Sequence, residues 1–293
     1  MKHKPTKFFS DGLELDASFY LGDTDPGPTA PLVIGCSGFT GLMNIHPERF
    51  ARSLTPRGFV GFGFDYRGFG KSEGTARYVT TEEQARDIVA AVDFARNHEL
   101  GKGRKVYLLG WGMAGGLILE ASRTLPPLDG LIAMNGFYDA IRVQKAVRGE
   151  KEFEAFMAEY HKERAARTAS RAPDKADPYH VYPLDPVTKV YVDGVLRKTD
   201  GFSGDVNFSF GESLLRFVPE RHLDHLAKTP ILIAHGATNA LHPPAEAHSL
   251  KEKYPGPAEV YLLEGAGHTE WMLDENPLFQ KMMDRVAAWL AEH

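Results

Sequence analysis

The sequence predicts an α/β protein built on an open, doubly wound and mostly parallel β-sheet. Three observations lead to this prediction. Short apolar segments alternate with helical patterns, glycine-rich turns follow several of the apolar segments, and 293 residues suffice for one such domain with an insertion. Alternating strands and helices imply right-handed crossovers, which place helices on both faces of the sheet.

Each predicted strand is a short apolar run bounded by turn residues. Residues 13–21 alternate with a period of two, which indicates an antiparallel opening strand. The other runs are apolar throughout, as expected of parallel strands that are buried on both faces. These runs cover residues 31–36, 59–66, 105–110, 130–136, 230–236 and 258–265.

Capping signals and apolar spacing predict helices between the strands. The segment Thr80-Thr81-Glu82-Glu83 is a capping box, and the helix it opens extends to about Asn97. Three further stretches have helical spacing, at residues 113–124, 243–253 and 277–291.

Residues 140–228 interrupt this alternation. We predict that they form an insertion on a core domain of residues 1–139 and 229–293. A charged helical pattern covers residues 150–167, and a segment rich in Pro, Asp and Tyr follows without an apolar parallel strand. Because the insertion leaves the sheet at the carboxyl end of a strand, where ligands bind, a lid is favoured over a surface decoration.

The composition is that of an ordinary globular domain. The chain is 43% hydrophobic and 25% charged, with a net charge of −5 and no basic run, which argues against nucleic acid as a partner. It has no signal-peptide pattern, no apolar run of membrane-spanning length, and a single cysteine, Cys36. We therefore expect a cytoplasmic protein without a membrane partner, a metal or a cofactor, and its assembly, a homodimer included, stays open.

The strongest functional signal lies at residues 105–116, KVYLLGWGMAGG. A short strand runs into a turn of small residues, and a helix begins near Met113. This is the pattern of a nucleophile elbow, whose usual G-x-S-x-G sequence places a serine at the tip. The tip here is Gly112, so no acyl-enzyme can form at this position.

Five segments in order resemble the α/β-hydrolase family, with dienelactone-hydrolase-like and polyketide-transferase-like members as the nearest relatives. They are SGFTG at 37–41, FDYRGFGKSEG at 64–74, GWGMAGG at 110–116, HGATN at 235–239, and EGAGH at 264–268. The resemblance implies an eight-stranded α/β-hydrolase sheet with a helical lid. It places Gly112 at the nucleophile position, Asn239 at the acid position and His268 at the catalytic histidine, so the triad is degenerate.

The resemblance also implies an oxyanion hole made by the backbone amides of Phe39 and Met113, which does not depend on side chains. We expect His268 to be a general base, with a purely structural hydrogen bond as the alternative. Asn239 would either accept a hydrogen bond from the imidazole or impose the wrong tautomer. Asp139 is either a substitute acid or the cap of the first helix of the insertion.

Three aromatic residues, Trp111, Tyr138 and Trp271, are expected to form the wall of an apolar pocket, with core packing as the alternative. Together these features predict a cofactor-independent enzyme for a small carbonyl or ester compound, of natural-product or xenobiotic kind by family analogy. The reaction would be lyase, isomerase or cyclase chemistry, or water-mediated hydrolysis. Two alternatives stay open: a non-catalytic ligand-binding protein, and a serine esterase inactivated by substitution at position 112.

Overall fold

The computed structural model describes residues 1–39, 41–75, 78–169, 178–202 and 206–293. Thr40 of the SGFTG segment and residues 170–177 and 203–205 of the predicted insertion lie outside these ranges. The strands form one eight-stranded sheet in the order β1-β2-β4-β3-β5-β6-β7-β8. Pairs β1–β2 and β2–β4 are antiparallel and all other neighbours are parallel, which confirms the predicted fold class.

The predicted strands are present with bounds shifted by a few residues. They are β2 (Leu13–Leu21), β3 (Leu32–Cys36), β4 (Val60–Phe64), β5 (Val106–Trp111), β6 (Gly130–Met134), β7 (Ile231–Gly236) and β8 (Ala258–Leu263). The structure adds β1 (Lys2–Ser10), which pairs with β2 at the edge of the sheet. No apolar run marks β1 because most of its side chains face solvent.

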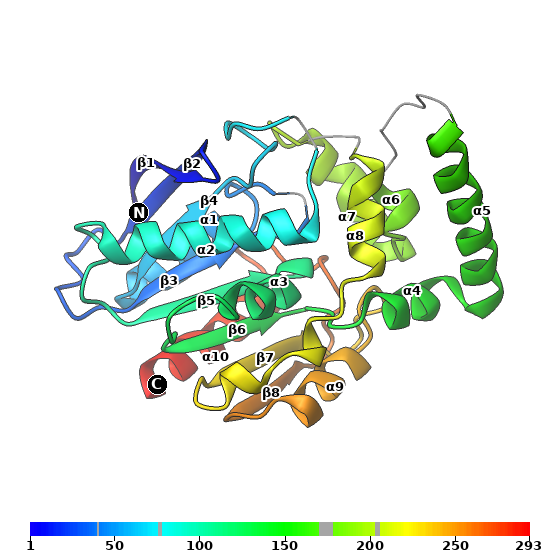
Figure 1. Ribbon diagram of the computed structural model, residues 1–293. Coiled ribbons are helices and arrows are strands. Elements are labelled where there is room, and N and C mark those ends of the chain that lie inside the picture. The colour runs from blue at the N-terminus through cyan, green and yellow to red at the C-terminus, as the bar shows by residue number, and fades with distance from the viewer. Residues whose placement is uncertain (40, 76–77, 170–177, 203–205) are drawn as a thin grey trace.

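Helices cover both faces of the sheet. Outside the segment between β6 and β7 they are α1 (Pro47–Leu54), α2 (Thr81–Asn97), α3 (Met113–Ser122), α9 (Ala245–Lys253) and α10 (Pro277–Glu292), with a 3₁₀ turn at Thr55–Arg57. Helices α1 and α10 bury their apolar side chains on one face, while α2, α3 and α9 cover the other (Figure 1). None of the helices in the described residues is long and apolar enough to cross a membrane.

Local sequence explains where two of these helices begin. Helix α2 starts at the predicted capping box, in which the Thr80 side chain accepts a hydrogen bond from the backbone N–H of Glu83 at 3.2 Å. Helix α3 packs closely on the end of β5 because residue 110 is glycine. A Cβ on Gly110 would lie 2.2 Å from the carbonyl oxygen of Ala114, so any larger residue would push the helix away.

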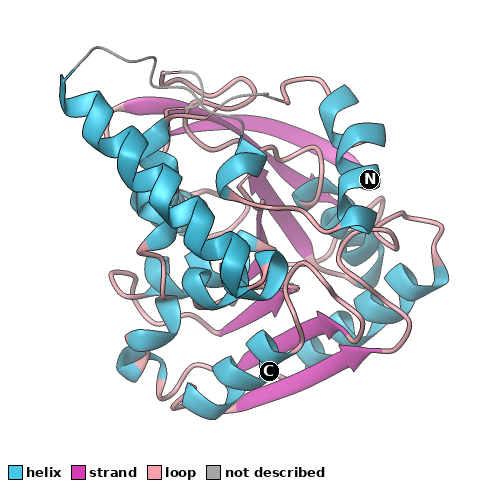
Figure 2. Cartoon of the chain, turned by 90° about the vertical axis from the view of Figure 1, so that its right-hand side faces the viewer, coloured by secondary structure: helices cyan, strands magenta, loops and turns pink. Residues whose placement is uncertain are grey.

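Between β6 and β7 the described part of the insertion is helical. Its elements are α4 (Ala140–Arg148), α5 (Glu150–Ala169), α6 (Pro178–Val181), α7 (Pro186–Gly194) and α8 (Phe208–Leu215), with 3₁₀ turns at Leu196–Lys198, Pro219–Arg221 and Asp224–Leu226. These helices gather at the carboxyl ends of the parallel strands (Figure 1). Figure 2 views the molecule from this side, with the long helix α5 in front of the sheet.

Candidate active site

Gly112 lies at the tip of the turn between β5 and α3. Its backbone has φ 57° and ψ −124°, a conformation that residues with a side chain rarely adopt. Among the described residues, a Cβ built on Gly112 would meet His268 alone, whose Nε2 atom would lie 3.9 Å away. The turn therefore has the backbone geometry of a nucleophile elbow, and the imidazole of His268 lies beside its tip.

Asn239 lies at the other nitrogen of the same imidazole. Its Oδ1 accepts a hydrogen bond from the backbone N–H of His242 at 2.9 Å, and its Nδ2 lies 3.1 Å from Nδ1 of His268. Because a backbone N–H is always a donor, the His242 contact fixes the orientation of the amide. The Nδ2 of Asn239 therefore donates to Nδ1, and the proton of neutral His268 resides on Nε2.

The environment of His268 keeps the imidazole neutral. Burial holds its pKa well below the ordinary value, and the neighbouring His242, His235 and His46 lower it further. With Nδ1 occupied as an acceptor, Nε2 presents an N–H to the pocket and no lone pair. This arrangement argues against the expected role of His268 as a general base. The physical reason is that the Asn239 amide donates where a carboxylate would accept.

Two backbone amides beside the elbow are the candidate donors of the predicted oxyanion hole. The N–H groups of Phe39 and Met113 have no acceptor within the residues that the structure describes. A Cβ on Gly38 would lie 3.3 Å from the Trp111 carbonyl oxygen and 4.0 Å from the Met113 nitrogen, so the Phe39 loop lies directly against the elbow. Met113 also begins a ten-residue helix, whose dipole favours negative charge there.

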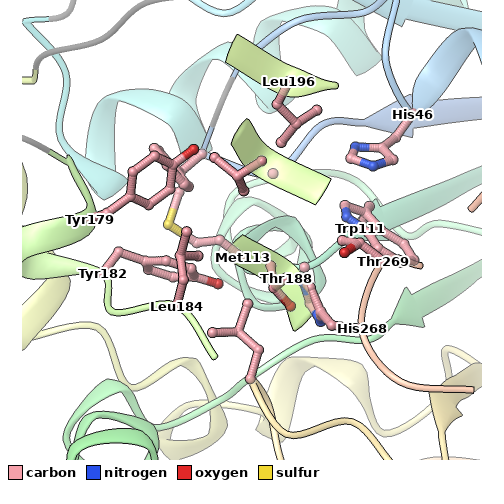
Figure 3. Close-up of a pocket in the computed structure, with 15 residues that line it drawn as sticks. His46, Trp111, Met113, Tyr179, Tyr182, Leu184, Thr188, Leu196, His268 and Thr269 are labelled. Atoms are coloured by element: carbon pink, nitrogen blue, oxygen red, sulfur yellow. The ribbon is translucent and has the colours of Figure 1, made fainter. Parts of the chain in front are cut away.

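A small cavity lies over the elbow and His268 (Figure 3). Its volume is about 50 Å³, enough for roughly three or four water molecules. Among the described residues, no Asp, Glu, Lys or Arg lines it, which favours a neutral ligand. The insertion forms one side of the wall with Tyr179, Tyr182, Leu184, Thr188, Val192 and Leu196.

Of the three aromatic residues predicted to line the pocket, only Trp111 does so. Trp271 packs behind it, with ring centroids 5.9 Å apart, and donates its indole N–H to the Gly267 carbonyl oxygen at 3.0 Å. Tyr138 is fully buried, with its hydroxyl packed against the backbone of Gly136. The expected substrate contacts of Tyr138 and Trp271 are therefore wrong, because both rings fill the core beneath the loops.

Asp139 caps helix α4 and does not reach the imidazole of His268. Its Oδ1 accepts hydrogen bonds from the backbone N–H groups of Ile141 and Arg142, each at 3.1 Å. This is the geometry of an N-terminal cap. The expectation that Asp139 replaces the triad acid is therefore wrong, and its carboxylate is used to begin the insertion.

Sequence reasoning missed several residues of the site, among them His46, Tyr182 and Asn135. His46 lines the cavity beside Trp111, and the Tyr182 hydroxyl donates to Nε2 of His242. Asn135 donates from Nδ2 to the His268 carbonyl oxygen at 2.8 Å and accepts from the Gly236 N–H at 2.7 Å. Its positive φ of 48° is typical of asparagine, so an Asn directly after strand β6 was the available signal. His46 and Tyr182 gave no comparable signal.

The fold and the site together define an α/β hydrolase. The chain belongs to the family described as Serine aminopeptidase, S33, whose sequence profile matches residues 27–275.

Two distant relatives cover nearly the whole chain. An uncharacterized 31.7 kDa protein from the traX-finO intergenic region of Escherichia coli is 23% identical over 264 residues, 90% of this chain and 91% of the relative. Acyltransferase drtE of Aspergillus calidoustus is 23% identical over 280 residues, 93% of this chain and 89% of the relative.

Two solved structures share the fold. DcsB in complex with its substrate analogue superposes with a TM-score of 0.81 at 17% identity, covering 99% of both chains. Hypothetical protein PA2218 from Pseudomonas aeruginosa also has a TM-score of 0.81, at 21% identity, covering 100% of this chain and 94% of the other.

Proposed function

We propose that this protein is a cofactor-independent enzyme that acts on a small, neutral carbonyl or ester compound without forming an acyl-enzyme. The observation that carries the proposal is the side-chain-free tip of the elbow, where a Cβ on Gly112 would lie 3.9 Å from Nε2 of His268. A substrate atom or a water molecule at this tip is beside the imidazole. The triad is then degenerate at both Gly112 and Asn239.

In this proposal the substrate carbonyl oxygen binds at the backbone N–H groups of Phe39 and Met113. The Nε2–H of His268 is a third donor, directed at the same region. Donors held in place before the reaction stabilise the negative charge that develops on an enolate or on a tetrahedral oxyanion. Lysis, isomerisation, cyclisation and water-mediated hydrolysis pass through such an oxyanion when a water molecule accepts the proton that the substrate or the attacking water loses, whereas covalent acyl transfer needs the absent hydroxyl. The name of the relative acyltransferase drtE supports a carbonyl as the reacting group.

We also propose that the insertion is a lid. Six of its residues line the cavity, and about 50 Å³ does not accommodate a whole ester or ketone of ordinary size. The insertion has to shift for such a compound to enter. Closing it afterwards would exclude water from the three donors and strengthen their hydrogen bonds.

A second candidate is a protein that binds the same class of compound without turning it over. The hydrogen bond from Asn239 to Nδ1 of His268 favours this candidate, because it leaves the imidazole without a lone pair facing the pocket. Carbonyl recognition needs only the donors, whereas proton removal needs a base.

The experiment compares wild type, His268→Leu and His268→Gln on activated esters, lactones and β-dicarbonyl compounds, with products read by mass spectrometry. We expect a reaction in the wild type that His268→Leu abolishes and His268→Gln partly retains, since glutamine keeps an N–H donor. Product masses separate hydrolysis from lysis and rearrangement. Ligand-dependent stabilisation without any product would favour the binding protein. Equal rates in all three proteins would refute a role for His268.

A further inference from the structure

His46 is a second imidazole in the wall of the candidate site. It directly precedes helix α1, and its ring stacks on Trp111 with centroids 4.8 Å apart and planes at 27°. His268 is another ring neighbour of that indole, at a centroid distance of 5.4 Å. Figure 3 shows the two imidazoles on either side of Trp111, at the border of one cavity.

Both ring nitrogens of His46 are buried, and neither has a hydrogen-bond partner within the described residues. The residue as a whole is only 3% exposed. His242, in the same region, is different: its Nδ1 donates to the Asn135 carbonyl oxygen and its Nε2 accepts from Tyr182. Buried polar groups are rarely left without a partner in folded proteins. The two unpartnered nitrogens therefore distinguish His46 from His242 and leave it free to bind a ligand group.

The chemistry of His46 limits what it can bind. Burial, and secondarily the positive charge of Arg49, hold its pKa well below the ordinary value, so the ring is neutral. A neutral imidazole has one N–H donor and one lone pair, whichever tautomer it adopts. A hydroxyl group can bind either nitrogen, because it accepts from an N–H and donates to a lone pair; since the two nitrogens point in different directions, one hydroxyl engages one of them. A carboxylate or phosphate would need a cation, and no Lys or Arg of the described residues lines the cavity.

We infer that His46 forms a polar subsite that binds a hydroxyl group of the substrate, so that the preferred ligands are hydroxy-carbonyl compounds. The inference rests on the proposed function, in which the carbonyl oxygen binds at Phe39, Met113 and His268. Thr269 supports it, because its hydroxyl is also buried at the cavity wall without a partner in the described residues. The indole of Trp111 lies between the two polar subsites.

The test uses two ketones that differ by one hydroxyl group, 4-hydroxy-4-methyl-2-pentanone and 4-methyl-2-pentanone. Ligand-detected NMR measures the dissociation constant of each for wild type, His46→Phe and His268→Leu. Phenylalanine keeps the stacking on Trp111 and removes both nitrogens. His46→Gln is the second variant and restores a donor and an acceptor, while thermal melting verifies that each protein is folded.

We expect the wild type to bind the hydroxy ketone about tenfold more tightly, the gain typical of one hydrogen bond to a buried group. In His46→Phe the dissociation constants of the two ketones should become nearly equal, mainly because binding of the hydroxy ketone weakens. His46→Gln should retain part of the preference for the hydroxy ketone. His268→Leu should raise the dissociation constants of both ketones by the same factor.

The two proposals fail in different ways. Equal binding of both ketones by the wild type would overturn the hydroxyl subsite and leave the carbonyl site intact. A preference that persists in His46→Phe would also overturn it, and would assign the hydroxyl to another group. If neither ketone binds at any soluble concentration, the proposed carbonyl site is wrong, and so is the inference that rests on it.

Discussion

The side-chain amide of Asn239 donates a hydrogen bond to Nδ1 of His268 across 3.1 Å. A carboxylate at position 239 would instead accept a hydrogen bond from Nδ1–H. The Asn239 amide therefore exchanges the donor and acceptor nitrogens of the imidazole. The proton then resides on Nε2, which faces the tip of the elbow at Gly112. The residues at positions 112 and 239 are thus consistent with each other, because a serine at the tip would find no base.

Restoring a serine hydrolase should therefore require both positions. We expect Gly112→Ser and Asn239→Asp to stay near background on p-nitrophenyl acetate, and the double variant to exceed either single variant by about a hundredfold, because triad members act as a unit. The space around Gly112 accommodates a Cβ, but a residue with a side chain is strained in this backbone conformation. The substitution should therefore lower the free energy of unfolding by roughly 1–3 kcal/mol.

A phosphonate adduct on the introduced serine of the double variant, read by mass spectrometry, would verify the acyl-enzyme route. Gly112→Ala combined with Asn239→Asp is the control, because it has the same backbone strain without a nucleophile. Activity in Gly112→Ser alone would contradict the assigned tautomer of His268.

Buried histidines should make the protein sensitive to acid. Burial lowers the pKa of His235 to about 4 and that of His242 to about 3, and it holds those of His46 and His268 well below 6.5. The unfolded chain binds more protons, so stability is full above pH 6.5 and falls as the pH drops towards the folded values. Each of these residues should cost roughly 1.4 kcal/mol per pH unit in that window.

Urea unfolding between pH 7.5 and pH 4.5 measures this loss. His235→Gln should flatten the slope by about one linked proton. A stability that does not change over this range would contradict neutral burial.

The Tyr182 hydroxyl connects the insertion to the core domain by donating to Nε2 of His242. Tyr182→Phe leaves that buried nitrogen without a donor and should lower the free energy of unfolding by about 1–3 kcal/mol. Hydrogen exchange in α6 and α7 should accelerate. Tyr191→Phe is a matched control, because its hydroxyl is buried without a partner in the described residues and its loss should be nearly neutral. Equal effects of the two variants would argue against this connection.

Asp139 should affect stability and not chemistry. Asp139→Ala removes the cap of α4 and should lower the free energy of unfolding by roughly 1 kcal/mol. Asp139→Asn should retain most of the stability that the cap contributes, since asparagine caps a helix nearly as well as aspartate. Ketone binding and any turnover should be the same in both variants once melting curves show folded protein. If a folded Asp139→Asn variant lost activity, Asp139 would have a role in the reaction as well as in capping α4.

Some of the site could be predicted because local sequence decides it. The elbow depends on the strand before Gly112, the close approach at Gly110 and the helix after Met113, all within a few residues. The motif order was enough to place His268 and Asn239 near this turn. The aromatic wall was predicted less well, because the sequence does not distinguish a ring that faces a cavity, such as Trp111, from one that packs behind it, such as Trp271.

The sequence by itself determined the mostly parallel sheet, the elbow and the lack of a nucleophile at residue 112, since these follow from apolar patterning and from glycine's lack of a side chain. Only the tertiary structure decided the tautomer of His268 and the place of His46. Both depend on groups far apart in the chain: the His242 N–H that orients Asn239, and the Trp111 ring on which His46 stacks. Hydrogen-bond direction and burial are properties of the packed chain, and no local pattern encodes them.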